Sequence, residues 1–540
     1  MYHKPSAALN TGSPPRACYF QASAGDCTGC GKLDATVPTG KIKNLLVANR
    51  GEIALRIIRT AKVEGIRTIA VYSEADAGAA HVAAADEAVL IGPPEPAQSY
   101  LKGSAIIAAA HANGADAIHP GYGFLSENEE FARATLESGL IFVGPPPRVM
   151  AALGDKISAR RLAAQAGVPI VPGIEASDLQ SARMFAQRVQ YPILIKASAG
   201  GGGRGMRVVV RLEDLEDSLE SASREARAAF GDGRLFIEKY LARPRHIEVQ
   251  ILGDGSGEIV ALGERECSIQ RRHQKLIEES PSPAVGHELR ARMCEAAIRL
   301  ATRSGYRNAG TVEFLLDGDD FYFLEVNARL QVEHPVTELR FGCDLVAEQL
   351  RIAAGERLVE PKRPRGWAIE CRLTAEEPEH GFRPATGKVL YLQLPSGPGV
   401  RVDSALEQGT VVTSYYDSLI AKVVSYGATR EEARRRMIAA LDDVSILGVG
   451  HSTAFVRAIV ASAPFAHGEL STRFIEENSP SSSWAHEHEN AALIAAALAT
   501  GDSKEFSFQS TDSGSHDPAR NSSRSSPWSK LGNFRLWNTR

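Results

Sequence analysis

The sequence predicts a multidomain protein with α/β and α+β parts, and three observations lead to this prediction. The chain has 540 residues, more than one hydrophobic core usually serves, so we expect roughly two to four domains. Between residues 41 and 150, short apolar segments alternate with helical patterns, which is typical of βαβ units and a parallel sheet. From about Met150 onward, the pattern becomes rich in strands, with a glycine-rich loop and a hairpin signal.

Composition and charge exclude several classes of protein. The chain is 44% hydrophobic and 23% charged, as expected of a globular enzyme. A formal charge of -4 argues against a protein that binds nucleic acid or anionic membranes through bulk charge. No apolar run reaches the roughly 18 residues that span a bilayer. The seven cysteines are odd in number and scattered, which predicts reduced thiols and a cytoplasmic location.

The two ends of the chain differ from the middle. Residues 1–40 are rich in Gly, Pro, Ser and Ala and predict a disordered extension. A start site assigned too far upstream would look the same. Residues 478–540 form a Ser-rich, low-complexity tail. We therefore expect the ordered part to run from about Lys41 to Glu477.

The apolar runs place the elements of the ordered part in sequence. Lys41–Glu52 predicts a buried strand and a turn, followed by a helix through Ala61. Further strands of the first domain are expected at 68–72, 88–91, 115–118 and 141–143. The second region is expected to contain strands between 235 and 263, a helix over 288–303, and a hairpin of 311–316 with 321–327. The third unit, 366–477, is expected to contain strands at 368–373, 388–393 and 420–426 and a helix over 430–441.

A glycine-rich loop follows one of the predicted strands. Residues 200–203 are four consecutive glycines, with Lys196 before them and Arg204 after them. Glycine lets backbone N–H groups approach an anion closely, at a cost in order unless that freedom is used. A flexible hairpin turn is the alternative. Because cations bracket the glycines, we favour a mobile loop that covers a phosphate.

Two other segments carry weaker signals. Glu238–Leu241, followed by His246, is a strand entering a linker, where backbone groups can meet an adenine edge. The run from Cys267 to Glu279 gathers Arg271, Arg272, His273 and Lys275 beside Gln270. Such a run is usually a solvated face. Its amide and histidine also suit the binding of a small oxyanion.

Residues 321–335 alternate apolar and polar side chains. The polar members on one face of an extended chain are Glu325, Asn327, Arg329, Gln331 and Glu333. An exposed amphipathic strand is the alternative. Two acids, two amides and a guanidinium on one face instead predict a surface that handles metals and anions.

Hairpin geometry divides this stretch into two parts. Glu313 and Glu325 point the same way only if they pair directly, which predicts an odd-length loop with a bulge. Glu313, Glu325 and Asn327 would then present oxygen ligands suited to Mg²⁺ or Mn²⁺. Glu325 and Glu333 would lie about 26 Å apart in a straight strand. The chain must therefore bend after about Asn327, which returns Arg329 and Glu333 toward the metal.

Taken together, these segments resemble the biotin carboxylase family of ATP-grasp ligases. The motifs that carry the resemblance are Ala48–Ala54, His119–Asn128, Gly154–Lys156, the glycine loop, Gln270–Lys275, Phe321–Pro335 and Ile369–Arg372. The resemblance implies a Rossmann-like N-terminal domain at 41–150 and an ATP-grasp domain at 151–350 with a mobile lid at about 170–240. It also implies a mixed α/β C-terminal domain at 366–477.

The resemblance also implies roles for individual residues. ATP would be bound by Lys156, Lys196, Gly202, Gly203, Glu238, Lys239, Tyr240, Leu241, His246, Gln270 and His273, with Glu313 and Glu325. Two Mg²⁺ or Mn²⁺ ions would be held by Glu313, Glu325 and Asn327. Bicarbonate would be bound by Lys275, Arg329, Gln331 and Val332 and deprotonated by Glu333, and Arg372 would stabilise the enolate form of biotin. Attack on the γ-phosphate gives carboxyphosphate, whose CO₂ carboxylates biotin while the lid excludes water.

The sequence departs from the family pattern near its C-terminal end. Ala199 stands where some members have a fifth glycine, and residues 448–453 replace the usual Gly-x-Lys-Thr-Asn. Residues 526–537 resemble the start of the middle domain of acyl-CoA carboxylase α subunits. We expect either a stand-alone subunit or an α subunit cut short.

The chain has no Met-Lys-Met biotin-attachment motif, so we expect the biotin to be carried by another chain. The expected partners are therefore a biotin carboxyl carrier protein or domain, a carboxyltransferase subunit, and further copies in a homodimer or larger assembly. We expect no nucleic acid or membrane partner. Another ATP-grasp ligase, or an inert scaffold within a carboxylase assembly, are the alternative functions.

Overall fold

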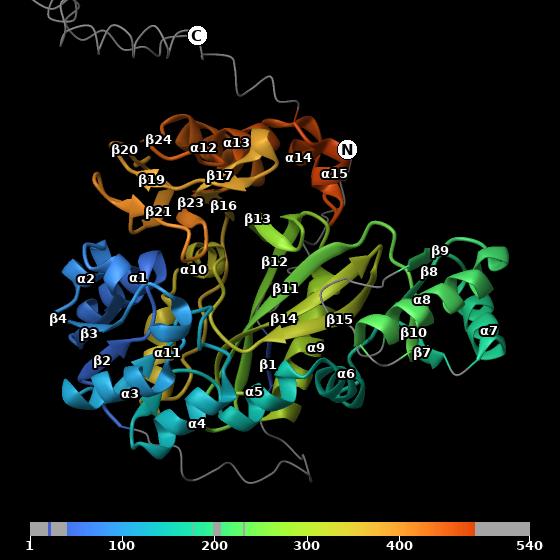
Figure 1. Cartoon of the computed structure of the whole chain (residues 1–540), viewed down its shortest axis with the longest axis horizontal. Helices are drawn as coiled ribbons and strands as arrows, with labels where there is room; N and C mark the ends of the chain where they lie inside the picture. Colours follow the sequence, from blue (N-terminus) through green and yellow to red (C-terminus); the bar gives the residue numbers. More distant parts are fainter. Residues whose placement is uncertain (1–19, 23–39, 177, 198–206, 231–232, 481–540) are drawn as a thin grey trace, which may run out of the picture. The chain divides into compact units, whose positions relative to one another are not determined.

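The structure is a computed structural model that describes residues 20–22, 40–176, 178–197, 207–230 and 233–480. These residues belong to one compact unit, which ends at Pro480 (Figure 1). Residues 481–540 of the predicted tail, and Gly202 and Gly203, lie outside the described residues. Among the residues described, no helix is both long and apolar enough to cross a bilayer.

The N-terminal domain is built on a parallel sheet, as predicted. Its five strands have the order β4-β3-β2-β5-β6. They are β2 (Asn44–Val47), β3 (Arg67–Ser73), β4 (Glu87–Gly92), β5 (Ala117–His119) and β6 (Ile141–Phe142). The helices are α1 (Gly51–Val63), α2 (Ala80–Ala84), α3 (Gly103–Ala112) and α4 (Glu129–Glu137). Buried Ile53, Ile57 and Ile58 pack the inner face of α1 against this sheet, which explains the apolar spacing of the segment.

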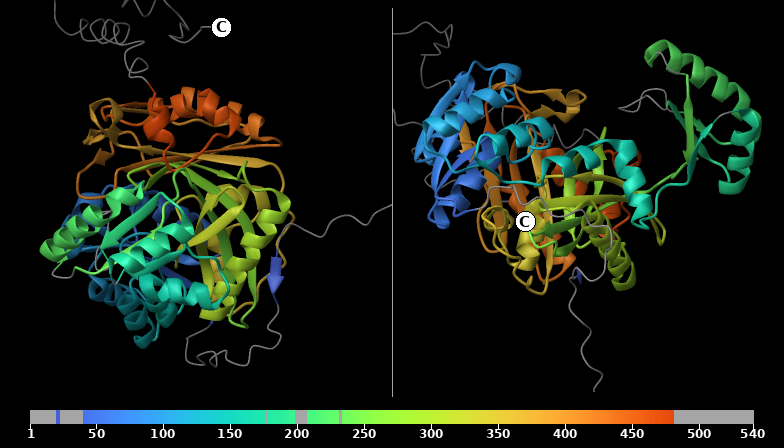
Figure 2. Two further views of the ribbon diagram at one scale, coloured as in Figure 1. Left: turned by 90° about the vertical axis from the view of Figure 1, so that its right-hand side faces the viewer. Right: turned by 90° about the horizontal axis from the view of Figure 1, so that it is seen from below.

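A small sheet forms the region of the predicted lid. Its strands are β7 (Gly173–Ala176), β8 (Ile193–Ala197), β9 (Arg207–Val209) and β10 (Leu235–Lys239), in the order β7-β10-β8-β9. Two helices, α7 (Leu179–Val189) and α8 (Leu215–Phe230), lie on one face of it (Figure 2). Phe185, Ile195 and Ile237 belong to a hydrophobic cluster confined to this region. Helices α5 (Pro147–Gly154) and α6 (Lys156–Gln165) precede the small sheet in the chain.

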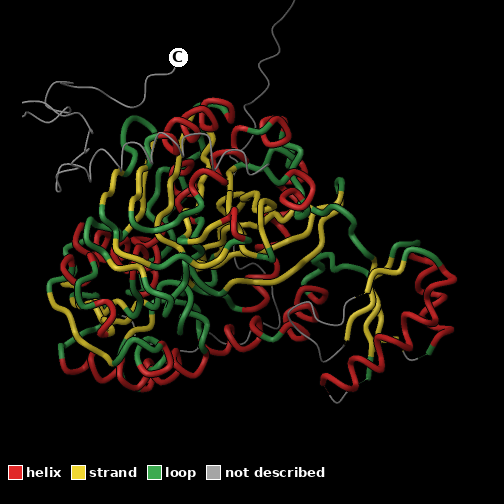
Figure 3. The backbone as a smooth tube through the Cα atoms, turned by 45° about the horizontal axis from the view of Figure 1, so that its top comes forward, coloured by secondary structure: helices red, strands yellow, loops and turns green. Residues whose placement is uncertain are grey.

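The second and third regions share one large antiparallel sheet, which the sequence does not predict. Its main path is β15-β14-β11-β12-β13-β16-β23-β21, and the long strands are visible in Figure 3. The first five are β15 (Asp320–Asn327), β14 (Asn308–Asp317), β11 (Arg245–Gly253), β12 (Ile259–Arg271) and β13 (Gln274–Ser280). The others are β16 (Trp367–Thr374), β23 (Leu419–Gly427) and β21 (Val400–Ser404). Pairing of β13 with β16 joins the two regions.

The structure differs from the predicted elements at two places. Phe20–Ala22, within the extension predicted to be disordered, form strand β1, which pairs with β12. The predicted strand at 388–393 is split into β19 (Gly387–Lys388) and β20 (Tyr391–Gln393). These short strands pair with β22 (Val411–Val412) and β24 (Ser445–Leu447) respectively. One continuous strand could not follow both partners.

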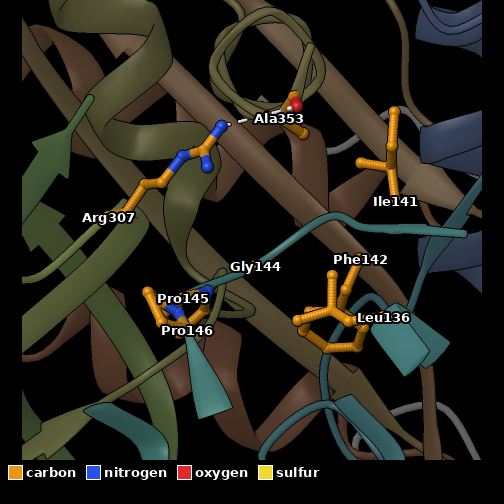
Figure 4. Close-up of a pocket in the computed structure, with 8 residues that line it drawn as sticks. All are labelled: Leu136, Ile141, Phe142, Gly144, Pro145, Pro146, Arg307 and Ala353. Carbon is orange, nitrogen blue, oxygen red and sulfur yellow. Dashed lines mark hydrogen bonds between the residues drawn. The ribbon is translucent and has the colours of Figure 1, made fainter. Parts of the chain in front are cut away.

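The remaining helices cover the large sheet and the C-terminal domain. They are α9 (His287–Ser304), α10 (His334–Phe341), α11 (Leu345–Ala353), α12 (Arg430–Asp442), α13 (Thr453–Ala461), α14 (Ala463–His467) and α15 (Phe474–Asn478). Arg307 donates to the carbonyl oxygen of Ile352, at 2.7 Å. It thereby caps the C-terminal end of α11, where helix carbonyls lack internal partners. Arg307 also lines a small pocket with Phe142 and other apolar side chains (Figure 4).

Candidate active site

The β14–β15 hairpin brings the predicted metal-binding acids together. Glu313 lies directly opposite Glu325. Asp317 pairs with Asp320, so the turn contains an even number of residues. Leu324 has no partner between the two registers and forms a bulge. The predicted pairing and bulge are confirmed. The predicted odd-length loop is wrong, because the bulge alone shifts the pairing by the one residue that brings Glu325 opposite Glu313.

The chain bends after Asn327, as predicted. Strand β15 ends at Asn327, and α10 begins at His334. The segment between them returns Glu333 to the hairpin, so that Lys275 Nζ lies 2.7 Å from Glu333 Oε1 and 2.8 Å from Glu313 Oε1. Glu333, near the end of the alternating stretch, and Glu313, on the facing strand of the hairpin, therefore meet at one ammonium group.

Lys275 is the centre of a buried ionic cluster. Besides Glu313 and Glu333, its ammonium donates to Glu248 Oε2 at 2.5 Å. Burial opposes the charge of Lys275, but these three carboxylates raise its pKa well above the ordinary value. Burial likewise opposes the charge of Glu333, yet Lys275 and Arg372 hold the pKa of its carboxyl below the ordinary value. Glu333 is therefore a carboxylate.

Arg372 lies between two acids of this cluster. Its Nε donates to Glu278 Oε1 at 2.6 Å, and its second guanidinium nitrogen donates to Glu333 Oε2 at 2.9 Å. Glu278 is fully buried. Burial raises the pKa of its carboxyl to about 7, although Arg372 acts in the opposite direction. Arg372 thus connects the predicted base to a second acid behind it.

Sequence reasoning missed Glu248, which accepts a hydrogen bond from Lys275, and Arg265, which pairs with Glu248. Both side chains are fully buried and paired to each other. Arg265 also donates to Gln250, at 2.7 Å, and to the hydroxyl groups of Thr311 and Thr337, both at 3.0 Å. A buried guanidinium is tolerated only when its donors are satisfied. The available signal was the alternation along β11, where Glu248 and Gln250 stand between apolar residues.

The other predicted bicarbonate residues surround the same cluster. Arg329 donates to Glu127 Oε2 at 2.9 Å and to Asn327 Oδ1 at 2.8 Å. Gln331 Nε2 donates to Glu313 Oε1 at 3.0 Å. The carbonyl oxygen of Val332 accepts a hydrogen bond from another buried lysine. The structure therefore brings together all the residues predicted for this step.

The chemistry of the hairpin acids suits a divalent cation. Burial raises the pKa of Glu325, and the neighbouring charge of Glu313 raises it further. A cation between two such carboxylates would relieve this repulsion. The amide of Asn327 donates to Glu313 at 2.8 Å, so Asn327 would have to turn its oxygen inward to act as a ligand. His246 Nε2 also lies 2.8 Å from Glu313 Oε2.

Several of the residues predicted to bind ATP lie on the small sheet or next to it, whereas His246, Gln270, Glu313 and Glu325 lie on strands of the large sheet. Lys196 on β8 donates to Glu238 on β10 at 2.7 Å. Lys239 Nζ lies 3.9 Å from Asp317 in the hairpin, and Leu241 is buried. The backbone N–H of Tyr240 donates to the carbonyl oxygen of Pro192. Lys156 is the first residue of α6.

The basic run between β12 and β13 does not form one anion site, contrary to its interpretation. Arg272 and His273 have positive φ angles of 48° and 68° and form an exposed turn. Arg271 donates to the carbonyl oxygen of Gly381 at 3.0 Å and lies over the ring of Phe382. Only Lys275, which pairs with Gln270 across the hairpin, enters the ionic cluster. The pleat and the turn separate residues that are adjacent in sequence.

Three family profiles match the chain one after another. The biotin carboxylase N-terminal domain matches residues 41–150, the carbamoyl-phosphate synthase L chain ATP binding domain matches residues 155–361, and the biotin carboxylase C-terminal domain matches residues 370–477. A pyruvate carboxylase subunit from Methanothermobacter thermautotrophicus is 50% identical over 438 residues, which are 80% of this chain and 89% of that relative. The chain belongs to the biotin carboxylase family.

Other relatives of this biotin carboxylase family member have different names. The α subunit of mitochondrial methylcrotonoyl-CoA carboxylase from Dictyostelium discoideum is 45% identical, over 92% of this chain and 70% of that relative. A solved structure shows the biotin carboxylase domain dimer of Hydrogenobacter thermophilus 2-oxoglutarate carboxylase with MgADP, ADP and bicarbonate. It is 45% identical, covers 83% of this chain and 98% of its own, and has a TM-score of 0.73.

These findings confirm the predicted family and fold class. Members of the biotin carboxylase family are ATP-dependent ligases with an ATP-grasp domain, and this chain is such a ligase. The Hydrogenobacter domain binds MgADP, ADP and bicarbonate, which agrees with the prediction of an adenine nucleotide, magnesium and bicarbonate. The roles of individual residues in this chain stay predictions.

Proposed function

We propose that this chain catalyses the first half-reaction of a biotin-dependent carboxylase. It would use ATP and bicarbonate to carboxylate biotin carried by a separate protein or domain. The observation that carries this proposal is the position of Glu333, whose carboxylate lies between Lys275 and Arg372 at 2.7 and 2.9 Å. Glu333 could act as a base on an anionic substrate that Lys275 binds. Arg372, on its other side, could stabilise a second anion.

Bicarbonate is a poor nucleophile, so it needs a base and a cationic site. Lys275 and Arg329 would bind its oxygens, with Gln331 and the main chain of Val332. Bound bicarbonate would share Lys275 and Arg372 with Glu333. It would weaken the attraction of these cations for Glu333 and so raise the pKa of its carboxyl. Glu333 would then accept the bicarbonate proton as the γ-phosphate of ATP is attacked, giving carboxyphosphate and ADP.

The nucleotide would lie between the small sheet and the hairpin. Lys196 and Lys156 would neutralise phosphate charge, and Lys239–Leu241 with His246 would border the rest of the nucleotide. Glu313, Glu325 and Asn327 would hold the two Mg²⁺ or Mn²⁺ ions, which would spread the charge of the transferring phosphoryl group. The repulsion between the paired hairpin acids supports this assignment.

Arg372 would act in the second step. Decomposition of carboxyphosphate gives CO₂ and a basic phosphate anion. The ureido nitrogen of biotin would lose its proton to this phosphate before it attacks CO₂. The guanidinium of Arg372 would stabilise the enolate oxygen that forms. Because Arg372 is bonded to Glu333, protonation of Glu333 in the first step would release part of the guanidinium for the second.

The partners follow from the need for carried biotin. We propose a biotin carboxyl carrier protein or domain on another chain, a carboxyltransferase subunit, and a homodimer or larger assembly in the cytoplasm. The relatives act in carboxylases named for pyruvate, methylcrotonoyl-CoA and 2-oxoglutarate. This variety supports the view that the final acceptor is selected by the carboxyltransferase. An inert scaffold is less well supported, because Lys275, Glu333 and Arg372 are all present and connected.

The test is ATP hydrolysis that depends on bicarbonate and is stimulated by free biotin. Glu333→Gln and Arg372→Ala are expected to lower the biotin-stimulated rate by on the order of 100-fold or more. The matched controls, Glu379→Gln and Arg435→Ala, change exposed residues of the C-terminal domain and should retain the wild-type rate. Hydrolysis that ignores biotin, or that neither active-site substitution affects, would overturn the proposed function.

A further inference from the structure

Lys422 is a fully buried lysine next to the candidate active site, with no role in the steps described above. It lies on β23, and its ammonium has three oxygen partners. Nζ donates to the carbonyl oxygen of Val332 at 3.0 Å, and it lies 3.2 Å from Glu52 Oε1 and 3.8 Å from Asp403 Oδ2. The three N–H donors of the ammonium group thus have three oxygen atoms around them.

The register of the large sheet places Lys422 beside Arg372. These two residues are directly opposite each other on β23 and β16, so their side chains project from the same face. Arg372 bonds to the carboxylate of Glu333, and Lys422 bonds to the main chain of the preceding residue, Val332. Two neighbouring cations thus hold two consecutive residues of the segment that carries the predicted base.

The counter-ions of Lys422 come from other parts of the chain. Glu52 belongs to α1 of the N-terminal domain, and its carboxylate also accepts a hydrogen bond from Tyr122. Asp403 lies on β21 and is bonded to Arg401 at 2.7 Å. Burial of an ammonium group is costly without such partners. An apolar side chain would fill the same space at lower cost, so the charge calls for a purpose beyond packing.

We propose that Lys422 is a positioning residue for bicarbonate activation: it fixes the peptide group between Val332 and Glu333, and so the main-chain position of the base. This inference rests on the proposed function and extends it to a residue on the C-terminal domain. A displacement of about 1 Å at a reacting group costs on the order of 100-fold in rate. Fixing the Val332 carbonyl therefore has a direct effect on the step that Glu333 performs.

The test compares Lys422→Met alone with Lys422→Met combined with Glu52→Gln. The single substitution leaves Glu52 buried without its cation, whereas Asp403 keeps Arg401. The double substitution replaces that buried acid with a neutral amide of the same shape and is expected to restore thermal stability close to that of the wild type. Lys388→Met, on an exposed lysine of the same domain, is the matched control. The readouts are the melting temperature, kcat/KM for bicarbonate and KM for ATP.

The expected result for the double variant is a loss of at least about 10-fold in kcat/KM for bicarbonate, with KM for ATP within about twofold of wild type. Lys422→Arg, which keeps a donor for the Val332 carbonyl, should recover part of the loss. A double variant with wild-type stability and wild-type kcat/KM for bicarbonate would overturn the inference, since the lysine would then serve only charge balance. Failure of the proposed function would look different, because the wild-type protein itself would show no bicarbonate-dependent hydrolysis.

Discussion

Glu313 and Glu325 face each other across the β14–β15 hairpin because one residue, Leu324, bulges out of the pairing. If Leu324 entered the ladder, the register set by the turn would pair it with Glu313. The side chain of Glu325 would then project from the opposite face of the sheet. The alignment of two candidate metal ligands therefore depends on how the strand accommodates one residue that is 42% exposed.

Deletion of Leu324 should preserve the alignment of the two acids. The shortened strand would pair without a bulge, and Glu325 would follow Phe323 directly, so it would still lie opposite Glu313. We expect biotin-stimulated ATP hydrolysis within about 10-fold of the wild-type rate, since Leu324 contributes an exposed side chain rather than a ligand. Circular dichroism would check that the fold is retained.

A second deletion provides the contrast. Removing Tyr322 together with Leu324 shifts the register by one residue, so that Glu325 would lie opposite Phe314 and point away from Glu313. This variant should lose activity by on the order of 100-fold or more. Equal activity of the single and double deletion variants would show that the register of Glu325 is unimportant.

Removal of a hairpin acid should weaken metal binding more than nucleotide binding. Glu325→Gln is expected to reduce the affinity for Mn²⁺ in the presence of ADP by at least about 10-fold, since a carboxylate ligand becomes a neutral amide. Asp320→Asn changes an exposed acid of the same hairpin and serves as the control. Calorimetric titration with Mn²⁺ measures the affinities. Equal Mn²⁺ affinity in the wild type and the Glu325 variant would remove this residue from the metal site.

Lys275 should be important for stability as well as for activity. Lys275→Met leaves Glu248, Glu313 and Glu333 without their shared cation, and breaking such buried pairs costs roughly 3–5 kcal/mol. Denaturant titration should show this loss, whereas Lys388→Met should leave the midpoint unchanged. Adding Glu248→Gln to the Lys275 variant should recover part of the stability by removing one buried charge. If Lys275→Met alone were as stable as the wild type, the ionic cluster would contribute little to the fold.

The stability contribution of Glu52 should depend on pH in a defined direction. Burial raises the pKa of its carboxyl from the ordinary 4.5 to about 7, with Lys422 acting in the opposite direction. Between these pH values the folded protein keeps a proton that the unfolded chain has lost. The free energy of unfolding therefore falls as pH rises through this range, by at most roughly 1.4 kcal/mol per unit for one group, and becomes level above it.

Glu52→Gln mimics the protonated form and isolates this effect. The unfolding free energy of the wild type minus that of the variant should decrease as pH rises from about 4.5 to about 7. Denaturant titration at several pH values measures both quantities. Glu379→Gln, at an exposed site, should show no such trend. If the wild-type value minus the variant value instead increased with pH, the pKa of Glu52 would be lowered in the folded protein.

Local sequence patterns predicted most of the elements but not how the sheets join. The strands of the N-terminal sheet are short apolar runs between helices, and proximity in sequence makes their parallel pairing predictable. The pairing of β13 with β16 joins segments separated by helices α9, α10 and α11 and by the β14–β15 hairpin. Such long-range pairing leaves no local pattern, so the single large sheet could not be predicted.

The candidate site divides in the same way. The sequence predicted that Glu313, Glu325 and Glu333 lie close together. The alternation of polar residues, the pairing of the hairpin and the length of an extended strand all concern one continuous stretch of chain. Glu248 and Arg265 were missed because the partner of each comes from another strand, which no local pattern reveals. The separation of His273 from Lys275 was also missed, since His273 lies in the turn itself, where φ is positive, whereas Lys275 lies on the strand that follows.

The region of the predicted lid has a hydrophobic cluster of its own, made by side chains such as Phe185, Ile195 and Ile237. A rotation of this region as a unit would leave that cluster intact and expose little new apolar surface. Heat capacity changes follow apolar exposure, so closure of the predicted lid, if it rotates as a unit, should add little to the heat capacity change of nucleotide binding. The enthalpy of closure would then be nearly constant with temperature, and the ratio of open to closed forms would follow a straight van 't Hoff line.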